Sequence, residues 1–291
     1  MFQGSITALI TPFRDGKVDD AAFRAFVEWQ IDEGTNALVP CGTTGESPTL
    51  SHDEHKRVTE ICIKAADGKV PVIAGTGSNS TAEAISLTAH AKRAGASAAL
   101  IVTPYYNKPT QEGLYQHYKA IHDAVDLPII IYNIPGRSVV DMSVDTMARL
   151  AELKNIVGVK DATADLARPM ATRLAIKKDF CLLSGEDATA VPFLAGGGRG
   201  CISVTANVAP RLCSTMQKAW RDGDLKTVMT LQDRLMPLHQ ALFCETSPAP
   251  VKYAASLLGK CTSETRLPMV EIKASSKERV KKAMVNAGLL N

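Results

Sequence analysis

The chain has 291 residues, of which 45% are hydrophobic, so it is long enough for one large domain core with further helices around it. Its 33 basic and 30 acidic residues leave a formal charge of +3, and no basic cluster with interleaved aromatic residues is present. The sequence therefore does not indicate nucleic-acid binding. No apolar stretch reaches the length of a membrane span, so no membrane partner is expected.

The seven cysteines are scattered, odd in number and never paired as Cys-x-x-Cys. Several lie inside apolar runs, which predicts reduced thiols packed in a core rather than a disulfide framework or a zinc site. The first residues lack the basic and apolar regions of a signal peptide. We therefore expect a cytoplasmic protein.

Eight short apolar runs with strand character alternate with helical patterns along the chain. The predicted strands cover residues 5–13, 36–42, 70–77, 98–106, 128–135, 156–160, 180–185 and 201–205. Helices are predicted at residues 20–32, after Ser51, after Ser80, at 111–125 and 144–150, from Asp165, up to Leu194, and at 209–221, 225–243, 250–258 and 277–287. Ser51 and Ser80 are each followed three residues later by glutamate, which is the spacing of a capping box.

This alternation, with a spacing near thirty residues, predicts an α/β fold of the (β/α)8 TIM-barrel type. We expect a catalytic barrel at residues 1–224 and a C-terminal helical region at 225–291 that packs on it. The alternative is a doubly wound open sheet, but no Gly-x-Gly-x-x-Gly motif follows the first strand.

The run Ile156-Val157-Gly158-Val159 is typical of a strand buried on both faces, and it is followed by Lys160. Lysine is costly to bury, so two interpretations are open. Either Lys160 caps the strand and extends its ammonium group to water, or it is a desolvated lysine that attacks a carbonyl as a neutral amine.

Tyr132 ends an apolar run in the preceding strand. Neighbouring strands lie about 4.8 Å apart, so Tyr132 and Lys160 at matching heights would be within reach of each other. A phenol at that place can carry protons to and from a lysine and its carbinolamine. The alternative is a core tyrosine whose hydroxyl bonds to a backbone carbonyl. Together, the two residues favour catalysis.

Barrel enzymes carry their chemistry at the C-terminal ends of the strands, where further candidates lie. Residues 42–46 follow the second strand, and their backbone N–H groups could hold a carboxylate, or they form an ordinary loop. Arg137 could bind a second carboxylate through its planar fork, or it is a surface arginine. The other candidates are Tyr105, Tyr106, Asn107, Asn133, Ser184, Gly185, Glu186, Ile202 and Ser203.

Two further features do not point to a bound group. The glycine-rich residues 196–200 precede a strand, whereas a phosphate-binding loop follows one, so they predict a tight turn. His52 and His55 lie near the start of a helix without a matching set of carboxylates or histidines at other strand ends. We therefore expect no metal.

The chain resembles the dihydrodipicolinate synthase family over its whole length. This family belongs to the N-acetylneuraminate lyase and class I pyruvate aldolase superfamily. The motifs that carry the resemblance are Gly42-Thr43-Thr44-Gly45-Glu46-Ser47, Tyr105-Tyr106, Tyr132-Asn133-Ile134-Pro135-Gly136-Arg137 and Gly158-Val159-Lys160-Asp161. The arginine after Tyr-Asn-x-Pro-Gly points to the synthases rather than to their relatives.

The resemblance implies a condensation of pyruvate with L-aspartate-4-semialdehyde on the diaminopimelate route to lysine, without a cofactor. Lys160 would form a Schiff base with the ketone of pyruvate. The proton relay would consist of Tyr132, Thr43 and Tyr106, the last from a neighbouring subunit. The substrate-binding positions would be Thr44, Ile202, Gly185 and Arg137, the last receiving the carboxylate of the aldehyde.

The resemblance also implies a homotetramer, a dimer of dimers, with L-lysine as a feedback inhibitor at a subunit interface. The positions that match the inhibitor site are Ser47, His52, His55, Asn79, Glu83 and Tyr105. His55 is the residue found in inhibitor-sensitive members. Pro48 stands where other members commonly carry alanine, and it stiffens the loop.

Two alternatives to this function are open. A sibling aldolase or lyase would use the same imine chemistry on sialic acid or another sugar keto acid. A non-catalytic barrel would sense pyruvate or lysine, but a sensor has no need of a neutral amine beside a phenol.

Overall fold

A computed structural model describes residues 2–291, and the chain divides into two compact units. Unit 1 consists of Met1–Gln3 and Val72–Ile202, and unit 2 consists of Gly4–Pro71 and Ser203–Asn291. Each unit is described by itself below.

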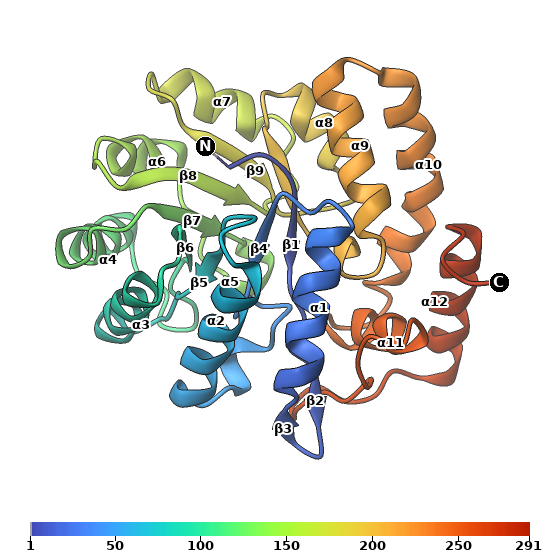
Figure 1. Ribbon diagram of the computed structural model, residues 1–291. Coiled ribbons are helices and arrows are strands. Elements are labelled where there is room, and N and C mark those ends of the chain that lie inside the picture. The colour runs from blue at the N-terminus through green and yellow to red at the C-terminus, as the bar shows by residue number, and fades with distance from the viewer. Residues whose placement is uncertain (1) are drawn as a thin grey trace. The chain divides into compact units, whose positions relative to one another are not determined.

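Six parallel strands form the sheet of unit 1, and they pair in chain order. They are β5 (Ile73–Gly75), β6 (Ala98–Val102), β7 (Ile129–Asn133), β8 (Ile156–Asp161), β9 (Cys181–Ser184) and β10 (Gly200–Ser203), whose last residue belongs to unit 2. Parallel neighbours need a crossover connection, and helices supply it. They are α3 (Thr81–Ala94), α4 (Gln111–Ala124), α5 (Pro135–Ser138), α6 (Val144–Ala151), α7 (Arg168–Ala175) and α8 (Ala190–Ala195), and Figure 1 shows α3, α4 and α6 outside the strands.

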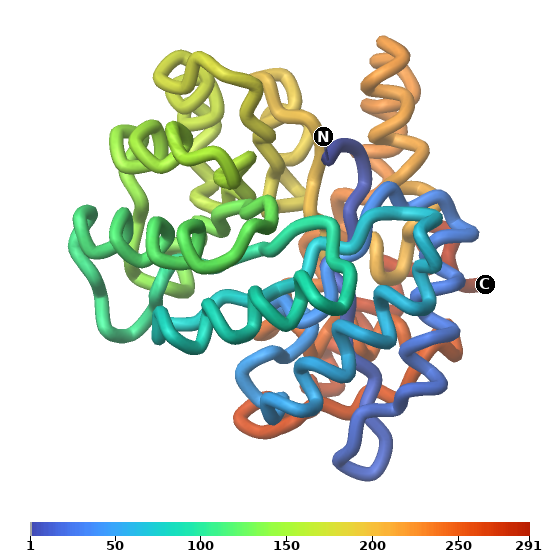
Figure 2. The backbone as a smooth tube through the Cα atoms, turned by 60° about the vertical axis from the view of Figure 1, so that its left-hand side comes forward, coloured from blue at the N-terminus to red at the C-terminus, as the bar shows by residue number. Residues whose placement is uncertain are grey.

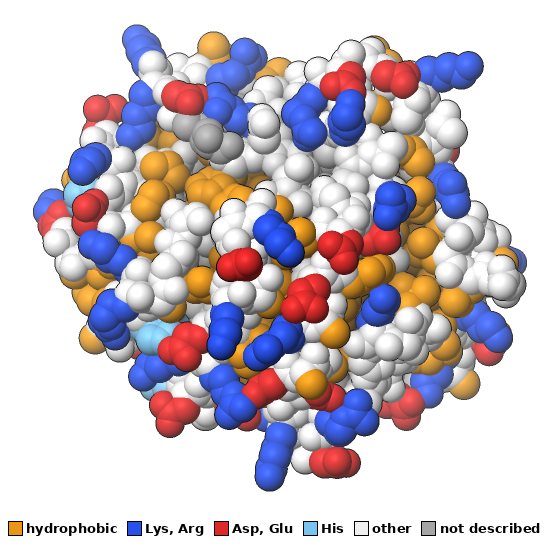
Figure 3. Space-filling model, in the orientation of Figure 1, with side chains coloured by type: hydrophobic (Ala, Val, Ile, Leu, Met, Phe, Trp, Pro, Cys, Tyr) orange, Lys and Arg blue, Asp and Glu red, His pale blue; other side chains and the backbone are white. Residues whose placement is uncertain are grey.

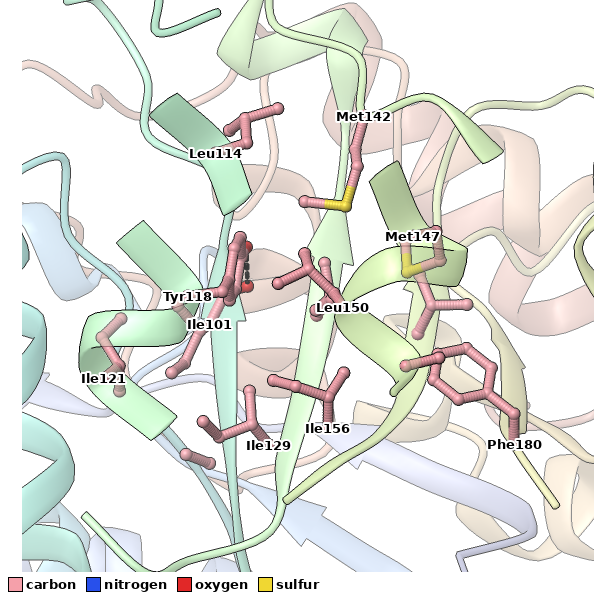
Figure 4. Packing of buried hydrophobic residues seen from close by; sticks show 14 of the residues in the cluster. Ile101, Leu114, Tyr118, Ile121, Ile129, Met142, Met147, Leu150, Ile156 and Phe180 are labelled. Atoms are coloured by element: carbon pink, nitrogen blue, oxygen red, sulfur yellow. Dashed lines mark hydrogen bonds between the residues drawn. The ribbon is translucent and has the colours of Figure 1, made fainter. Parts of the chain in front are cut away.

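The core of unit 1 lies between the strands and these outer helices. Leu114, Tyr118 and Ile121 project from α4 at helical spacing, and Met147 and Leu150 project from α6 (Figure 4). The Tyr118 hydroxyl is buried and donates to the carbonyl oxygen of Ile101 at 2.8 Å. The core thus fixes the helices against β6, β7 and β8.

Unit 2 contains the remaining two strands of the parallel sheet, β1 (Gly4–Ala8) and β4 (Ala37–Val39), which pair with each other. A small hairpin, β2 (Phe13–Arg14) and β3 (Lys17–Val18), precedes the crossover helix α1 (Asp20–Asp32). The other elements are η1 (Ser47–Thr49), α2 (His52–Ala66), η2 (Thr205–Asn207), α9 (Pro210–Asp222), α10 (Leu225–Ala241), α11 (Ala249–Leu257) and α12 (Ala274–Asn286).

The N-terminal hairpin of unit 2 lies beside the segment that follows α11, as the blue and red parts of Figure 2 show. The Thr262 hydroxyl donates to the carbonyl oxygen of Phe13 at 2.7 Å, and Arg266 Nη2 donates to that of Gly16 at 2.8 Å. Two segments about 250 residues apart are therefore joined within this unit.

Eight parallel strands with helices between them, followed by further helices, confirm the predicted (β/α)8 fold with C-terminal helices. Within unit 1 the strand order follows the chain without a reversal, whereas a doubly wound sheet reverses its order. The boundary between residues 224 and 225 coincides with the start of α10, and its role as a domain limit stays a prediction.

Several element boundaries differ from the prediction. The first strand ends at Ala8 rather than at residue 13, because the chain then enters the hairpin. The Ser51 capping box is confirmed, but Ser80 makes no side-chain cap bond. The Glu83 carboxylate instead accepts a hydrogen bond from Ser78 Oγ. The helix expected from Asp165 begins at Arg168.

Basic and acidic side chains are interspersed on the face seen in Figure 3, without a single-sign patch. Among residues 2–291, no helix has both the length and the apolar character needed to cross a membrane.

A buried ion pair ties α11 to the loop of residues 42–46. Lys252 Nζ lies 2.7 Å from Glu46 Oε1, and the two side chains are 0% and 2% exposed. The other carboxylate oxygen, Glu46 Oε2, accepts from the backbone N–H of Arg266 at 3.0 Å, and Lys252 Nζ lies 4.0 Å from the centre of the Phe13 ring. Burial lowers the pKa of Lys252, an effect that the Glu46 carboxylate opposes. The two buried charges thus lie in direct contact with each other.

Lys252→Met is expected to lower the free energy of unfolding by about 3–5 kcal/mol, because it leaves the Glu46 charge buried without its partner. The double variant Lys252→Met/Glu46→Gln should recover much of this loss, since no unpaired charge remains. Denaturant unfolding measures both. Lys218→Met, which removes an exposed ion pair with Asp222, is the control and should cost at most about 1 kcal/mol. A single variant as mild as this control would contradict the prediction.

His117 should make stability depend on pH. It lies on α4, its Nδ1 is 2.9 Å from Thr81 Oγ1, and burial lowers its pKa from 6.5 to about 4. Below pH 6.5 the unfolded chain binds a proton that the folded chain excludes, so stability falls as the pH drops toward 4. His117→Gln should remove up to about 3 kcal/mol of this dependence in denaturant unfolding between pH 7.5 and 4. The exposed His52→Gln variant is the control, and identical pH profiles for the two variants would refute the expectation.

Candidate active site

Lys160 and Tyr132 face each other at the C-terminal ends of two neighbouring strands. Tyr132 of β7 pairs in register with Lys160 of β8, as the matching strand positions predicted. Both side chains are buried, at 5% and 6% exposed, and Lys160 Nζ lies 4.0 Å from the centre of the Tyr132 ring. The interpretation of Lys160 as a solvent-exposed cap is therefore wrong.

Gly185 borders the lysine side chain. It directly follows β9, and its N–H donates to the carbonyl oxygen of Asp161 at 2.7 Å. A Cβ atom at position 185 would lie 3.1 Å from Lys160 Cε and 2.8 Å from Ala162 Cβ. The glycine thus leaves the space that the lysine stem needs. Ile202, on β10, is buried, and the residue before it pairs with Ser184 of β9.

Glu186, a candidate from its place at a strand end, is a charged neighbour of Lys160 to which the family resemblance assigned no role. It is partly buried after β9, and its N–H donates to Ser184 Oγ at 3.2 Å. Burial raises the pKa of the Glu186 carboxyl, and the Asp187 charge adds to this, whereas the Lys160 charge opposes it. The sequence feature that pointed to Glu186 was its position directly after an apolar strand.

Arg137 lies just beyond the end of β7, on the one-turn helix α5, and is exposed. Asn133, the last residue of β7, is buried beside Tyr132, and its carbonyl oxygen accepts from the N–H of Ala162 after β8 at 2.9 Å. The strand end that carries Tyr132 therefore leads directly into the turn that carries Arg137.

Thr43 and Thr44 lie in unit 2, in the loop that follows β4. The N–H groups of Gly45 and Ser47 donate to the carbonyl oxygen of Gly42, and the N–H of Glu46 donates to that of Thr43. The N–H groups of Gly45 and Glu46 are thus already bonded within the turn, so the expectation that this loop holds an anion falls on Thr43 and Thr44, and it stays a prediction.

The residues that match the inhibitor site belong to both units. In unit 1, Asn79 Nδ2 donates to the carbonyl oxygen of Tyr105 at 3.2 Å. Burial raises the pKa of Tyr105, and the nearby Glu83 charge adds to this effect. The structure thus brings together Asn79, Glu83 and Tyr105. In unit 2, Ser47, His52 and His55 lie on η1 and the first turn of α2, with His55 buried.

Tyr106 differs from the other candidates because it is 90% exposed. It also has a positive φ of 68°, which is uncommon for a residue with a side chain. Among residues 2–291, no group of three or more histidine, cysteine, aspartate or glutamate side chains is placed to hold a metal ion.

Several known proteins are similar to this chain over its whole length. The model of the dihydrodipicolinate synthetase family matches residues 1–287. A 4-hydroxy-tetrahydrodipicolinate synthase of Rhodospirillum centenum is 71% identical over 290 residues, which cover 100% of both chains. A crystal structure of dihydrodipicolinate synthase from Acinetobacter baumannii, complexed with pyruvate, is 49% identical, with a TM-score of 0.97 and 100% of both chains covered.

A second solved structure is that of dihydrodipicolinate synthase from Cyanidioschyzon merolae with lysine bound. It is 40% identical to this chain, with a TM-score of 0.96, and the match covers 99% of each chain. Both its fold and the family model extend over nearly the whole chain. The chain therefore belongs to the dihydrodipicolinate synthetase family, whose members are lyases of the class I aldolase superfamily.

Proposed function

We propose that Lys160 is the imine-forming residue of a 4-hydroxy-tetrahydrodipicolinate synthase that condenses pyruvate with L-aspartate-4-semialdehyde. The observation that carries this proposal is the buried Lys160 side chain, in register with Tyr132 and 4.0 Å from the centre of its ring. Support also comes from the pyruvate complex of the Acinetobacter baumannii relative. The reaction belongs to lysine biosynthesis through diaminopimelate.

The chemistry follows from the amine. Lys160 Nζ attacks the ketone carbon of pyruvate, and water leaves as the imine forms. The protonated imine accepts electrons, so the methyl group loses a proton and an enamine results. The enamine carbon then attacks the aldehyde carbon of the second substrate, and the new carbon–carbon bond forms as the aldehyde oxygen takes up a proton. No cofactor is required.

Three hydroxyl groups move protons in this scheme, those of Tyr132, Thr43 and Tyr106. Tyr132 is next to the amine and is the first acceptor or donor. Tyr106 is exposed on its own chain, which favours its contribution to the site of a neighbouring copy. This role fits a homotetramer built as a dimer of dimers, working in the cytoplasm.

The substrates are held by a second group of residues. Pyruvate is bound by Thr44, Gly185 and Ile202, and Gly185 already borders the Lys160 stem. Arg137 receives the carboxylate of the aldehyde, because its planar guanidinium can donate two parallel hydrogen bonds to a carboxylate.

L-lysine is the proposed feedback inhibitor, bound by Ser47, His52, His55, Asn79, Glu83 and Tyr105. The structure of the Cyanidioschyzon merolae relative with lysine bound supports this, as does the grouping of the three unit 1 members. Calorimetric titration with L-lysine should show saturable binding, and Glu83→Gln should weaken it, because the amino groups of lysine lose an anionic partner. The absence of heat in the unmodified protein would remove this proposal.

Borohydride reduction in the presence of pyruvate should trap a covalent adduct on the peptide that contains Lys160, because the imine becomes a stable secondary amine. Peptide mass spectrometry locates the adduct. Lys154, an exposed lysine that precedes the same strand, is the internal control and should stay unmodified. Tyr132→Phe should lower kcat about 10²–10⁴-fold through the loss of proton transfer. An adduct that persists in Lys160→Met would falsify the assignment of the nucleophile.

Arg137→Ala should separate the synthase from the alternative sugar keto-acid lyase. We expect kcat/KM for L-aspartate-4-semialdehyde to fall about 100-fold, since the substrate carboxylate loses its bidentate partner, while the borohydride adduct with pyruvate is retained. Steady-state kinetics with both substrates measures this. If the unmodified enzyme cleaved sialic acid more efficiently than it used the semialdehyde, the lyase would be the correct function.

A further inference from the structure

The turn that carries Arg137 is closed by one buried amide. Asn133, which is 1% exposed, precedes the turn at the end of β7. Its Oδ1 accepts from the N–H of Met142 at 3.1 Å, and its Nδ2 donates to Asp141 Oδ1 at 2.8 Å. The two ends of the turn, on either side of Arg137, are therefore joined through a single side chain.

Arg168, the first residue of α7, fixes the far end of the turn. Its Nη1 and Nη2 donate to the two carboxylate oxygens of Asp141 at 2.9 and 2.7 Å, and Nη1 also donates to the carbonyl oxygen of Met142 at 2.9 Å. The Met142 side chain lies in the core cluster (Figure 4). The turn therefore ends at a point that is fixed both by a planar fork and by core packing.

The backbone between these points is in an unfavourable conformation. Val139 has a φ of 63°, in the left-handed region that β-branched residues rarely adopt. Its neighbour Ser138 is buried and is held on both sides, since its Oγ accepts from Thr103 Oγ1 at 3.2 Å and donates to the carbonyl oxygen of Ile134 at 2.9 Å. Such a conformation persists only where the surrounding contacts impose it.

We propose that Arg168 and Asp141, acting through the turn closed by Asn133, are positioning residues that present the Arg137 guanidinium to the carboxylate of the aldehyde substrate. This inference rests on the proposed function, which gives Arg137 that substrate group. A guanidinium binds a carboxylate with two hydrogen bonds only when both N–H groups point at it. The arginine side chain is long and flexible, so it reaches this orientation reproducibly only when the backbone that carries it is fixed.

The solvent exposure of the Arg168–Asp141 pair favours a geometric role. The side chains are 18% and 43% exposed, and partly exposed ion pairs add little to stability. A displacement of about 1 Å at a substrate-binding group, in contrast, can lower the rate about 100-fold. The main consequence of the pair is therefore expected in binding of the aldehyde rather than in folding.

The test is Arg168→Met, which keeps the apolar stem and removes all three hydrogen bonds. We expect KM for L-aspartate-4-semialdehyde to rise about tenfold or more, while KM for pyruvate and the borohydride adduct at Lys160 stay unchanged. Asp141→Asn should shift the same constant in the same direction. Equal increases in KM for both substrates would indicate a general structural role and would overturn the proposal.

Arg149→Met is the matched control, because Arg149 Nη1 bonds to the Glu112 carboxylate at 3.0 Å in an exposed ion pair of the same unit. It should leave both KM values unchanged. The double variant Arg168→Met/Arg137→Ala should be no worse than Arg137→Ala alone, because Arg168 acts through Arg137. Losses that multiply in the double variant would refute this dependence.

These measurements distinguish a failure of the proposed function from a failure of the positioning role of Arg168 and Asp141. If the unmodified protein formed no pyruvate adduct at Lys160, or Arg137→Ala left the semialdehyde kinetics unchanged, the proposed function or the Arg137 assignment would fail and the positioning role with it. If the adduct formed and Arg137→Ala behaved as expected, but Arg168→Met matched Arg149→Met, only the positioning role would be overturned.

Discussion

The site depends on the in-register pairing of β7 with β8, which places the Lys160 amine over the Tyr132 ring. The C-terminal ends of parallel strands lie at the same edge of a sheet. Backbone hydrogen bonds between the two strands therefore hold the residues near these ends at matching heights. A one-residue slip would turn either side chain to the opposite face of the sheet. The core of α4 and α6 packed on these strands holds that register.

Lys160 and Lys252 are both buried, but their surroundings differ. Each amine lies 4.0 Å from the centre of an aromatic ring, Tyr132 for Lys160 and Phe13 for Lys252. Lys252 also lies 2.7 Å from the Glu46 carboxylate, whereas Gly185 makes room for the stem of Lys160. Removal of either partner would leave an unpaired charge in the interior, so the Lys252–Glu46 pair is a structural contact. The pair joins α11 to the loop of Thr43, so the C-terminal helices have a direct structural connection to that loop.

The turn after β7 differs from these two buried lysines, because it carries an exposed arginine side chain on a rigid backbone. Arg137 is exposed, while Asn133 and Ser138 of the same segment are buried and hydrogen-bonded, and Arg168 donates hydrogen bonds to Asp141 at the end of the turn. The fixed backbone sets the point from which the guanidinium reaches a ligand. It also lowers the entropy that the guanidinium loses when it binds that ligand.

The sequence by itself determined the alternation of strands and helices, the Ser51 capping box and the candidacy of Lys160 and Tyr132. These features depend on local periodicity and on a polar residue at the end of an apolar run, both of which can be read along the chain. The same signal was present at Lys252, a lysine within an apolar helix, but its partner is 206 residues away. Only the tertiary structure decided that pairing, the end of the first strand at Ala8 and the closure of the Arg137 turn by Asn133, Asp141 and Arg168. The Lys252–Glu46 pair and the bond from Arg168 to Asp141 join residues 206 and 27 positions apart in the sequence, and local pattern carries no information on which distant group will satisfy a buried charge or hold a turn.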